Sequence, residues 1–109
     1  MDPILRATTA TGAVYDDPSE DLIYELLGDI ERDEEQFAVI QRLADTSGRT
    51  YAQVIKCDDG AWLVERRDRG PESHDAVTLP SLRQAHQALT SWAFELPESP
   101  PVRWSKLEL

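Results

Sequence analysis

The sequence predicts an α+β fold in which an antiparallel β-meander of about four strands is combined with two helices. Three observations lead to this prediction. Two segments show helical periodicity behind capping residues, four consecutive segments are rich in β-forming residues, and the connections between those four are short. With 109 residues, of which 40% are hydrophobic, the chain is expected to form a single domain over residues 1–109 around one core.

The N-terminal third is predicted to contain a short strand or hairpin arm followed by a helix. Residues 4–8 and 13–15 lean towards β-structure and flank the turn signal Thr11-Gly12. The helix is expected to begin in the segment 17–20, with Asp17 as the N-cap, Pro18 at the first helical position and Glu20 as a capping-box acid. An apolar stripe at helical spacing follows, formed by Leu22, Ile23, Leu26, Leu27 and Ile30.

The central segments are predicted to be strands over residues 37–43, 51–57, 61–67 and 74–79. Ser47-Gly48 marks a turn in the first connection, and Asp59-Gly60 predicts a tight hairpin in the second. Gly70-Pro71 interrupts the chain in the third. Connections this short favour antiparallel neighbours.

A second helix is predicted from Ser81, because Ser81 and Gln84 have capping-box spacing. We expect this helix to pack across the sheet through one apolar face, formed by Leu82, Ala85, Leu89, Trp92 and Ala93. Pro97–Pro101 is expected to be a stiff connector, and residues 102–109 are compatible with a last strand. Trp62 and Trp92 are expected in the core.

Charge is distributed very unevenly along the chain. Residues 1–35 carry 11 acidic residues and two arginines, whereas residues 36–109 carry 10 acidic and nine basic residues, so nearly the whole net charge of −10 lies in the first third. A field of this sign repels nucleic acid and anionic membranes and attracts basic protein surfaces. The one basic cluster, Arg66, Arg67 and Arg69, is interrupted by Asp68. Nucleic-acid binding is therefore disfavoured.

Residues for catalysis or metal binding are sparse. The chain has two histidines, His74 and His86, one cysteine, Cys57, no zinc-ligand spacing and no phosphate-binding glycine loop. Cys57 with His74 is the only conceivable nucleophilic pair, and the adjacent Asp58 disfavours a thiolate there. We therefore expect no catalytic residue, no cofactor and no metal, and we expect His86 at the surface or at its boundary.

The lone Cys57 fits a reducing cytoplasm. The first 15 residues lack the pattern of a signal peptide, and no stretch approaches the ~20 apolar residues of a membrane span. The expected localisation is cytoplasmic.

Two positions are possible for the Glu65 side chain, depending on which face of its strand is buried. If Trp62 and Val64 face the core, Glu65 lies on the outer face beside Arg67, and Arg66 falls at the core margin, where it must pair or snorkel. If the opposite face is buried, Glu65 needs a basic partner in the core. A cross-strand ion pair is expected. The alternative function is a small enzyme or ligand-binding domain, with a pocket between the sheet and the second helix that uses Glu65 and His74.

Several local patterns together resemble short actinobacterial immunity proteins of polymorphic toxin systems. The residues that carry the resemblance are Asp16-Asp17-Pro18-Ser19, Val64-Glu65-Arg66-Arg67 with Gly70 and His74, and Ala85, Leu89, Trp92 and Trp104. The resemblance implies a partner that is a toxin, of nuclease or deaminase type. Such toxins bind phosphates through basic clefts, to which an acidic inhibitor would be attracted.

The predicted partner-binding surface is the acidic side of the first helix together with the acids that flank it. Its members are Asp17, Glu20, Asp21, Glu25, Asp29, Glu31, Asp33, Glu34 and Glu35. The expected partner is a protein with a basic surface. The alternative that this charge serves only solubility stays open. A sheet edge or an exposed Trp104 is compatible with a homodimer.

Overall fold

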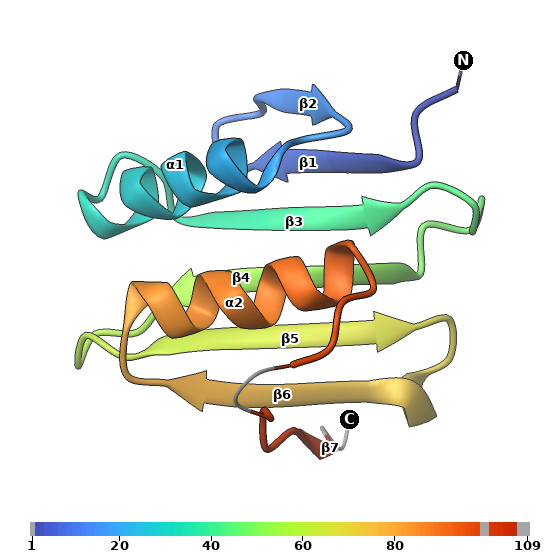
Figure 1. Cartoon of the computed structure of the whole chain (residues 1–109). Coiled ribbons are helices and arrows are strands. Elements are labelled where there is room, and N and C mark those ends of the chain that lie inside the picture. Colours follow the sequence, from blue (N-terminus) through green and yellow to red (C-terminus); the bar gives the residue numbers. More distant parts are fainter. Residues whose placement is uncertain (1, 99–100, 107–109) are drawn as a thin grey trace.

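A computed structural model describes residues 2–98 and 101–106. Two helices lie on one face of a seven-stranded antiparallel sheet with the strand order β2-β1-β3-β4-β5-β6-β7 (Figure 1). The elements are β1 (Leu5–Thr9), β2 (Val14–Asp16), α1 (Glu20–Glu31), β3 (Phe37–Arg42), β4 (Thr50–Lys56), β5 (Trp62–Asp68), β6 (His74–Leu79), α2 (Leu82–Ala93) and β7 (Ser105–Lys106), with a 3-10 turn at Pro71–Ser73. The predicted α+β class and the predicted meander are confirmed, and the meander corresponds to β3–β6.

The connections explain the order of the strands. The β4–β5 hairpin closes tightly at Gly60, whose φ of +89° favours glycine, and Cys57 N donates to Ala61 O over 2.7 Å. At the N-terminal end, β1 lies between β2 and β3 and is antiparallel to both. Strands β2 and β3 are therefore parallel to each other, and α1 connects them by crossing over the sheet.

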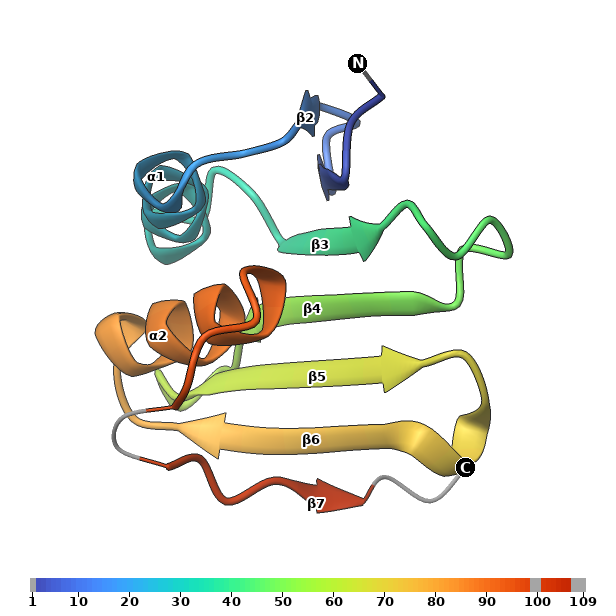
Figure 2. The same ribbon diagram turned by 45° about the vertical axis from the view of Figure 1, so that its right-hand side comes forward.

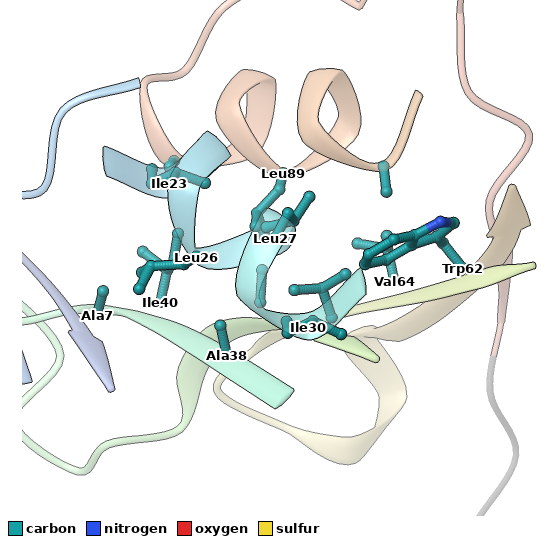
Figure 3. Close-up of a cluster of buried hydrophobic side chains, with 14 of the residues drawn as sticks. Ala7, Ile23, Leu26, Leu27, Ile30, Ala38, Ile40, Trp62, Val64 and Leu89 are labelled. Atoms are coloured by element: carbon teal, nitrogen blue, oxygen red, sulfur yellow. The ribbon is translucent and has the colours of Figure 1, made fainter. Parts of the chain in front are cut away.

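The core lies between the sheet and the two helices (Figure 3). Alternation along each strand turns every second side chain towards the helices, as the pairing of Val54 with Val64 illustrates. Trp62 is the largest fully buried side chain, as expected from the sequence, and Trp92 packs half-buried against the core. The helices contribute Ile23, Leu26, Leu27 and Ile30 from α1 and Ala85, Leu89 and Ala93 from α2.

Both helices lie on the same side of the sheet and touch each other (Figure 2). Helix α1 contacts β3 and β4, whereas α2 contacts β4, β5 and β6, so the predicted packing of the second helix on the sheet is confirmed. No helix in the described ranges covers the other face. That face carries a half-buried cross-strand row of Phe37, Ile55 and Leu63.

The start of α1 differs from the prediction. Ser19 is the N-cap, and its hydroxyl accepts a hydrogen bond from Leu22 N at 3.1 Å. Asp17 is not the cap, because its carboxylate accepts from the backbone N–H groups of Ile4, at 2.8 Å, and Leu5, at 3.0 Å. Two donors at the start of β1 thus occupy this side chain. Pro18 consequently precedes the cap and does not occupy the first helical position.

The start of α2 confirms Ser81 as the N-cap, with Gln84 bonded to its hydroxyl and not to its backbone N–H as in a complete capping box. The Ser81 hydroxyl accepts from Gln84 N at 3.2 Å, and it lies 3.0 Å from Gln84 Oε1, to which it donates. Of the described residues in the segment 102–109 expected from sequence to form a last strand, Ser105 and Lys106 pair with β6 and residues 102–104 do not. Residues 107–109 lie outside the described part of the chain.

Candidate functional site

The acidic side of α1 faces away from the core. Because Ile23, Leu26, Leu27 and Ile30 are buried, the positions between them point outward. Most of the predicted partner-binding residues are exposed there or in the segment directly after the helix. They are Glu20, Asp21, Glu25, Glu31, Asp33 and Glu34.

Two of the nine predicted residues have structural roles in the N-terminal hairpin. Asp17 holds the start of β1, as described above. Glu35 is half-buried and accepts hydrogen bonds from Thr11 N at 3.1 Å and Thr11 Oγ1 at 2.6 Å. The Thr11 hydroxyl, followed by that of Thr9, holds the pKa of the Glu35 carboxyl below its ordinary value. These two carboxylates stabilise the fold, and a partner would have to compete with those bonds.

Two further residues share one arginine at the end of α1. Arg32 Nη2 lies 2.6 Å from Asp29 Oδ1, and Arg32 Nε lies 3.4 Å from Glu34 Oε1. The pairing raises the pKa of the Arg32 guanidinium, with the hydrogen bond to Glu34 as the largest cause. Arg32 therefore offsets part of the negative charge at this end of the helix.

The remaining five acids form what we call the acidic face, which consists of Glu20, Asp21, Glu25, Glu31 and Asp33. All five are exposed, and none forms a salt bridge with a basic side chain of the described residues. The side chain of Lys56 reaches the acidic face, and its Nζ donates to the carbonyl oxygen of Glu31 over 3.4 Å. The acidic face is therefore a surface of concentrated negative charge.

An aromatic residue that the sequence analysis did not single out lies within the acidic face. Tyr24 is 50% exposed, and its ring meets the ring of His86 edge-on with a centroid distance of 5.1 Å. His86 Nε2 lies 2.9 Å from the carbonyl oxygen of Glu20. A carbonyl oxygen only accepts, so Nε2 carries the proton in this bond. The signal for Tyr24 was present in the sequence, because it is an aromatic residue outside the apolar stripe.

The structure decides between the two possible positions of the Glu65 side chain. Trp62 and Val64 are buried, so Glu65 lies on the outer face of the sheet. Its Oε1 is 3.7 Å from Nε2 of His74, which is 6% exposed. Neither ring nitrogen of His74 has a hydrogen-bond partner among the described residues. Arg66 pairs across the strands with Asp75 at 3.1 Å, as the first reading required.

A hollow of about 590 Å³ does lie beside α2, between that helix, β6 and the segment 101–105. Val77, Leu79 and Ala88 form its apolar part, and Gln84 and Gln87 supply amide groups. Glu65 and His74 do not line it. The predicted combination of a pocket beside the second helix with these two residues is therefore wrong, because alternation along β5 and β6 turns the pair to the opposite face.

Two further arrangements considered from the sequence, a metal site and a Cys57–His74 pair, are not formed by the described residues. No group of three or more His, Cys, Asp or Glu residues there is placed to hold a metal ion. Cys57 follows the end of β4 that pairs with Trp62, whereas His74 pairs with Arg67 at the other end of β5. The length of a strand thus separates the thiol from the imidazole. No helix in the described part of the chain has the length and apolar character required to cross a membrane.

Comparison with protein-family models, with curated proteins and with solved structures finds no match to this chain.

Proposed function

We propose that this protein is a small cytoplasmic binding protein that neutralises a partner with a basic surface, and that the partner is a toxin of nuclease or deaminase type. The observation that carries the proposal is the acidic face of α1. Five exposed carboxylates on and directly after one helix form no salt bridge with a basic side chain of the described residues, and an exposed tyrosine lies between them.

The physical argument begins with the field of this surface. Uneven charge raises association rates with a complementary partner by about 10- to 1,000-fold, and salt weakens the effect steeply. A toxin that acts on nucleic acid needs a basic cleft for phosphates, so a row of carboxylates can occupy the position of the substrate backbone. Tyr24 adds an aromatic contact surface, which the carboxylates do not provide. A half-exposed aromatic ring is a typical anchor at the centre of an interface.

The alternative is that the charge serves solubility alone. Charge that serves solubility has no need to be concentrated, whereas here the acids gather on α1 and the rest of the chain is nearly balanced. The cost of this concentration is repulsion between neighbouring carboxylates. We take that cost as support for a surface used in recognition.

The test combines co-purification with association kinetics. The first candidate partner is the product of the gene adjacent to the one that encodes this protein, purified in an inactive form. The variant Asp21→Lys/Glu25→Lys reverses two charges of the acidic face, and we expect the association rate constant at low salt to fall about tenfold or more. The variant Tyr24→Ala is expected to raise mainly the dissociation rate.

The matched control is Asp58→Lys/Glu72→Lys, which reverses two exposed acids outside α1. We expect this variant to associate at nearly the wild-type rate. A partner whose association is insensitive to salt and to both double reversals would show that the acidic face serves solubility alone.

A second candidate function rests on the hollow beside α2. Its volume of about 590 Å³ lies within the range of small-molecule sites, about 300–1,000 Å³. Its apolar wall, two amide side chains and one residue of each charge, Glu98 and Arg103, suit a ligand without net charge. A fragment screen monitored through the methyl resonances of Val77 and Leu79 tests this function, and Ala88→Phe should abolish any binding by filling the hollow. Binding that survives this substitution would contradict the candidate.

A further inference from the structure

The hollow beside α2 borders the edge of strand β6. It is lined by four consecutive residues of that strand, Ala76, Val77, Thr78 and Leu79. Alternation turns Val77 and Leu79 towards the helices, and it turns Ala76 and Thr78 towards the other face. Residues of both faces can line one hollow only where it reaches the edge of the strand. The backbone of β6 is therefore part of the wall of this hollow.

The hydrogen bonds between β4 and β5 show which way the backbone groups of β5 point. Hydrogen-bonded and non-hydrogen-bonded pairs alternate along antiparallel strands. At one end of this ladder, Cys57 N donates to Ala61 O over 2.7 Å. At the other end, Arg69 N donates to Arg49 O over 3.1 Å. Both pairs fit the register of the ladder, so the odd-numbered residues of β5 bond to β4 and the even-numbered ones bond to β6.

The same alternation leaves Thr78 with free backbone groups. Even-numbered residues of β5 face Val77 and Leu79, so the N–H and C=O groups of these two bond to β5. Thr78 lies between them, is exposed, and turns both of its groups to the open side of β6. On that side the pairing with β7 stops at Ala76. Among the described residues, the backbone of Thr78 therefore has no hydrogen-bond partner there.

The segment after α2 is held away from this edge by Glu98. The carboxylate of Glu98 accepts from Val102 N at 3.2 Å and from the indole Nε1 of Trp104 at 2.7 Å. The Trp104 ring in turn stacks on Arg66, with a distance of 4.0 Å between the guanidinium carbon and the ring centroid. These contacts give Val102 and Trp104 partners other than β6, which leaves the edge at Thr78 open.

We propose that the open edge of β6 at Thr78 binds a short extended segment of a partner protein. One residue of the segment exchanges both of its backbone hydrogen bonds with Thr78, as in an antiparallel strand pair. Its two neighbours then point to the same side as Val77 and Leu79, where they pack on these two and on Ala88. The preferred segment therefore has an apolar residue on each side of its central residue.

Such binding rests on the second candidate function proposed above, because it uses the same hollow, and it makes the ligand a peptide. Gln84 and Gln87 supply amide groups to the other peptide bonds of the segment. Glu98 and Arg103 add one charge of each sign, which suits a segment without net charge. The acidic face lies on α1 and takes no part.

The test is an NMR titration with a pool of end-blocked pentapeptides that carry valine, leucine or isoleucine at positions two and four and serine or threonine elsewhere. The control pool has the same composition, with the apolar residues at positions two and three. With the first pool we expect saturable shifts of the Thr78 amide and of the Val77 and Leu79 methyl groups, and slower hydrogen exchange at the Thr78 amide. Equal shifts with both pools, or no saturation with either, would overturn the proposal.

A modification of the peptide tests the backbone bonds without altering the protein. N-methylation of the central residue removes the donor that meets Thr78 O and should weaken the affinity about tenfold or more. N-methylation of the fourth residue is the matched control, because its N–H points away from β6, and it should leave the affinity nearly unchanged. Equal effects at the two positions would contradict strand pairing.

A proline variant tests the same edge from the side of the protein. Thr78→Pro removes the N–H that faces the hollow and keeps the bonds between β5 and β6, so it should abolish the saturable shifts of the methyl groups. The matched control is Val14→Pro in the edge strand β2. Its N–H points away from β1, because Thr9 N donates to Ala13 O in that ladder. Thermal unfolding checks that both variants fold.

Two outcomes separate this site from the candidate function on which it rests. Unchanged peptide affinity in folded Thr78→Pro would exclude the pairing. A hollow that binds small fragments but neither peptide pool would retain the second candidate function and overturn the peptide site alone.

Discussion

Helices α1 and α2 share their length and their type of cap, yet they have different tasks. Each has 12 residues and an N-cap serine whose hydroxyl accepts from the backbone N–H three residues later. Helix α1 places isoleucines and leucines in the core, whereas three of the five buried residues of α2 are alanines. The small side chains let α2 lie close to the sheet over β4, β5 and β6. Helix α1 covers β3 and β4 with larger ones.

The outer sides of the two helices differ even more. The exposed side of α1 carries acids and contacts few other elements, whereas α2 contains neither aspartate nor glutamate and borders the hollow beside β6. A helix that contacts neighbours on several sides has few positions free for charge. The comparison teaches that negative charge accumulates on the helix whose outer side the fold does not need.

The largest effects are expected where both helices meet the core. Leu27→Ala in α1 and Leu89→Ala in α2 each remove a completely buried side chain, so each should lower the free energy of unfolding by about 2–5 kcal/mol. Urea denaturation measures this. A loss below about 1 kcal/mol for one of the two would show that its helix is not part of the cooperative core.

Overpacking tests why α2 has alanines. Ala85→Leu should cost about 1–3 kcal/mol, because Ala85 is fully buried between the helix and the sheet. The control is Gln87→Leu on the exposed side of the same helix, for which we expect a change within about 0.5 kcal/mol. If Ala85→Leu were neutral, the close approach of α2 would not be set by its small residues.

The N-caps of α1 and α2 can be compared in the same way, with smaller expected effects on stability. Ser19→Ala and Ser81→Ala should each cost about 1 kcal/mol in thermal or urea denaturation. Ser81→Asp should keep the cap and raise the free energy of unfolding by about 0.3–1 kcal/mol over the wild type, since α2 has no acid in its first turn. Ser19→Asp should raise the free energy of unfolding by less, because Glu20 and Asp21 already lie in the first turn of α1. Equal gains at both positions would contradict this account.

Acid pH tests a carboxylate that holds the connection between β3 and β4, which is Asp45. Hydrogen bonds from Ser47 and Thr50 lower the pKa of Asp45 from 3.8 to about 2. Because the folded pKa lies below the unfolded one, the stabilisation is present above about pH 4 and is lost as the pH falls through about 2. Asp45→Asn should therefore lower stability at neutral pH and flatten its decline in acid. The measurement is thermal unfolding between pH 2 and 7, and an acid decline in this variant as steep as that of the wild type would contradict the account.

The sequence determined most of the secondary structure, because hydrophobic periodicity and turn chemistry act over a few residues. Both helices, the meander from β3 to β6 and the hairpin at Gly60 lie close to their predicted positions. The N-cap of α1 lies two residues after its predicted position, since Asp17 accepts from the backbone donors of Ile4 and Leu5, which are 13 and 12 residues away. Neither spacing nor propensity reports a contact over that separation.

The sequence by itself specified where the acidic residues lie along the chain, whereas the partners of each side chain depended on the tertiary structure. Composition located the acids on α1, because an apolar stripe commits the remaining positions to the outside. Only the fold decided that Asp17 and Glu35 accept hydrogen bonds from the N-terminal hairpin and that Arg32 pairs with Asp29 and Glu34. The five carboxylates of the acidic face are those left without such a partner. Only the fold brought Arg42 over the ring of Trp92, because the end of β3 and the end of α2 meet in space although they are 50 residues apart in the sequence. Local patterns fix which way a side chain points, whereas its neighbours are fixed by strand order and helix placement.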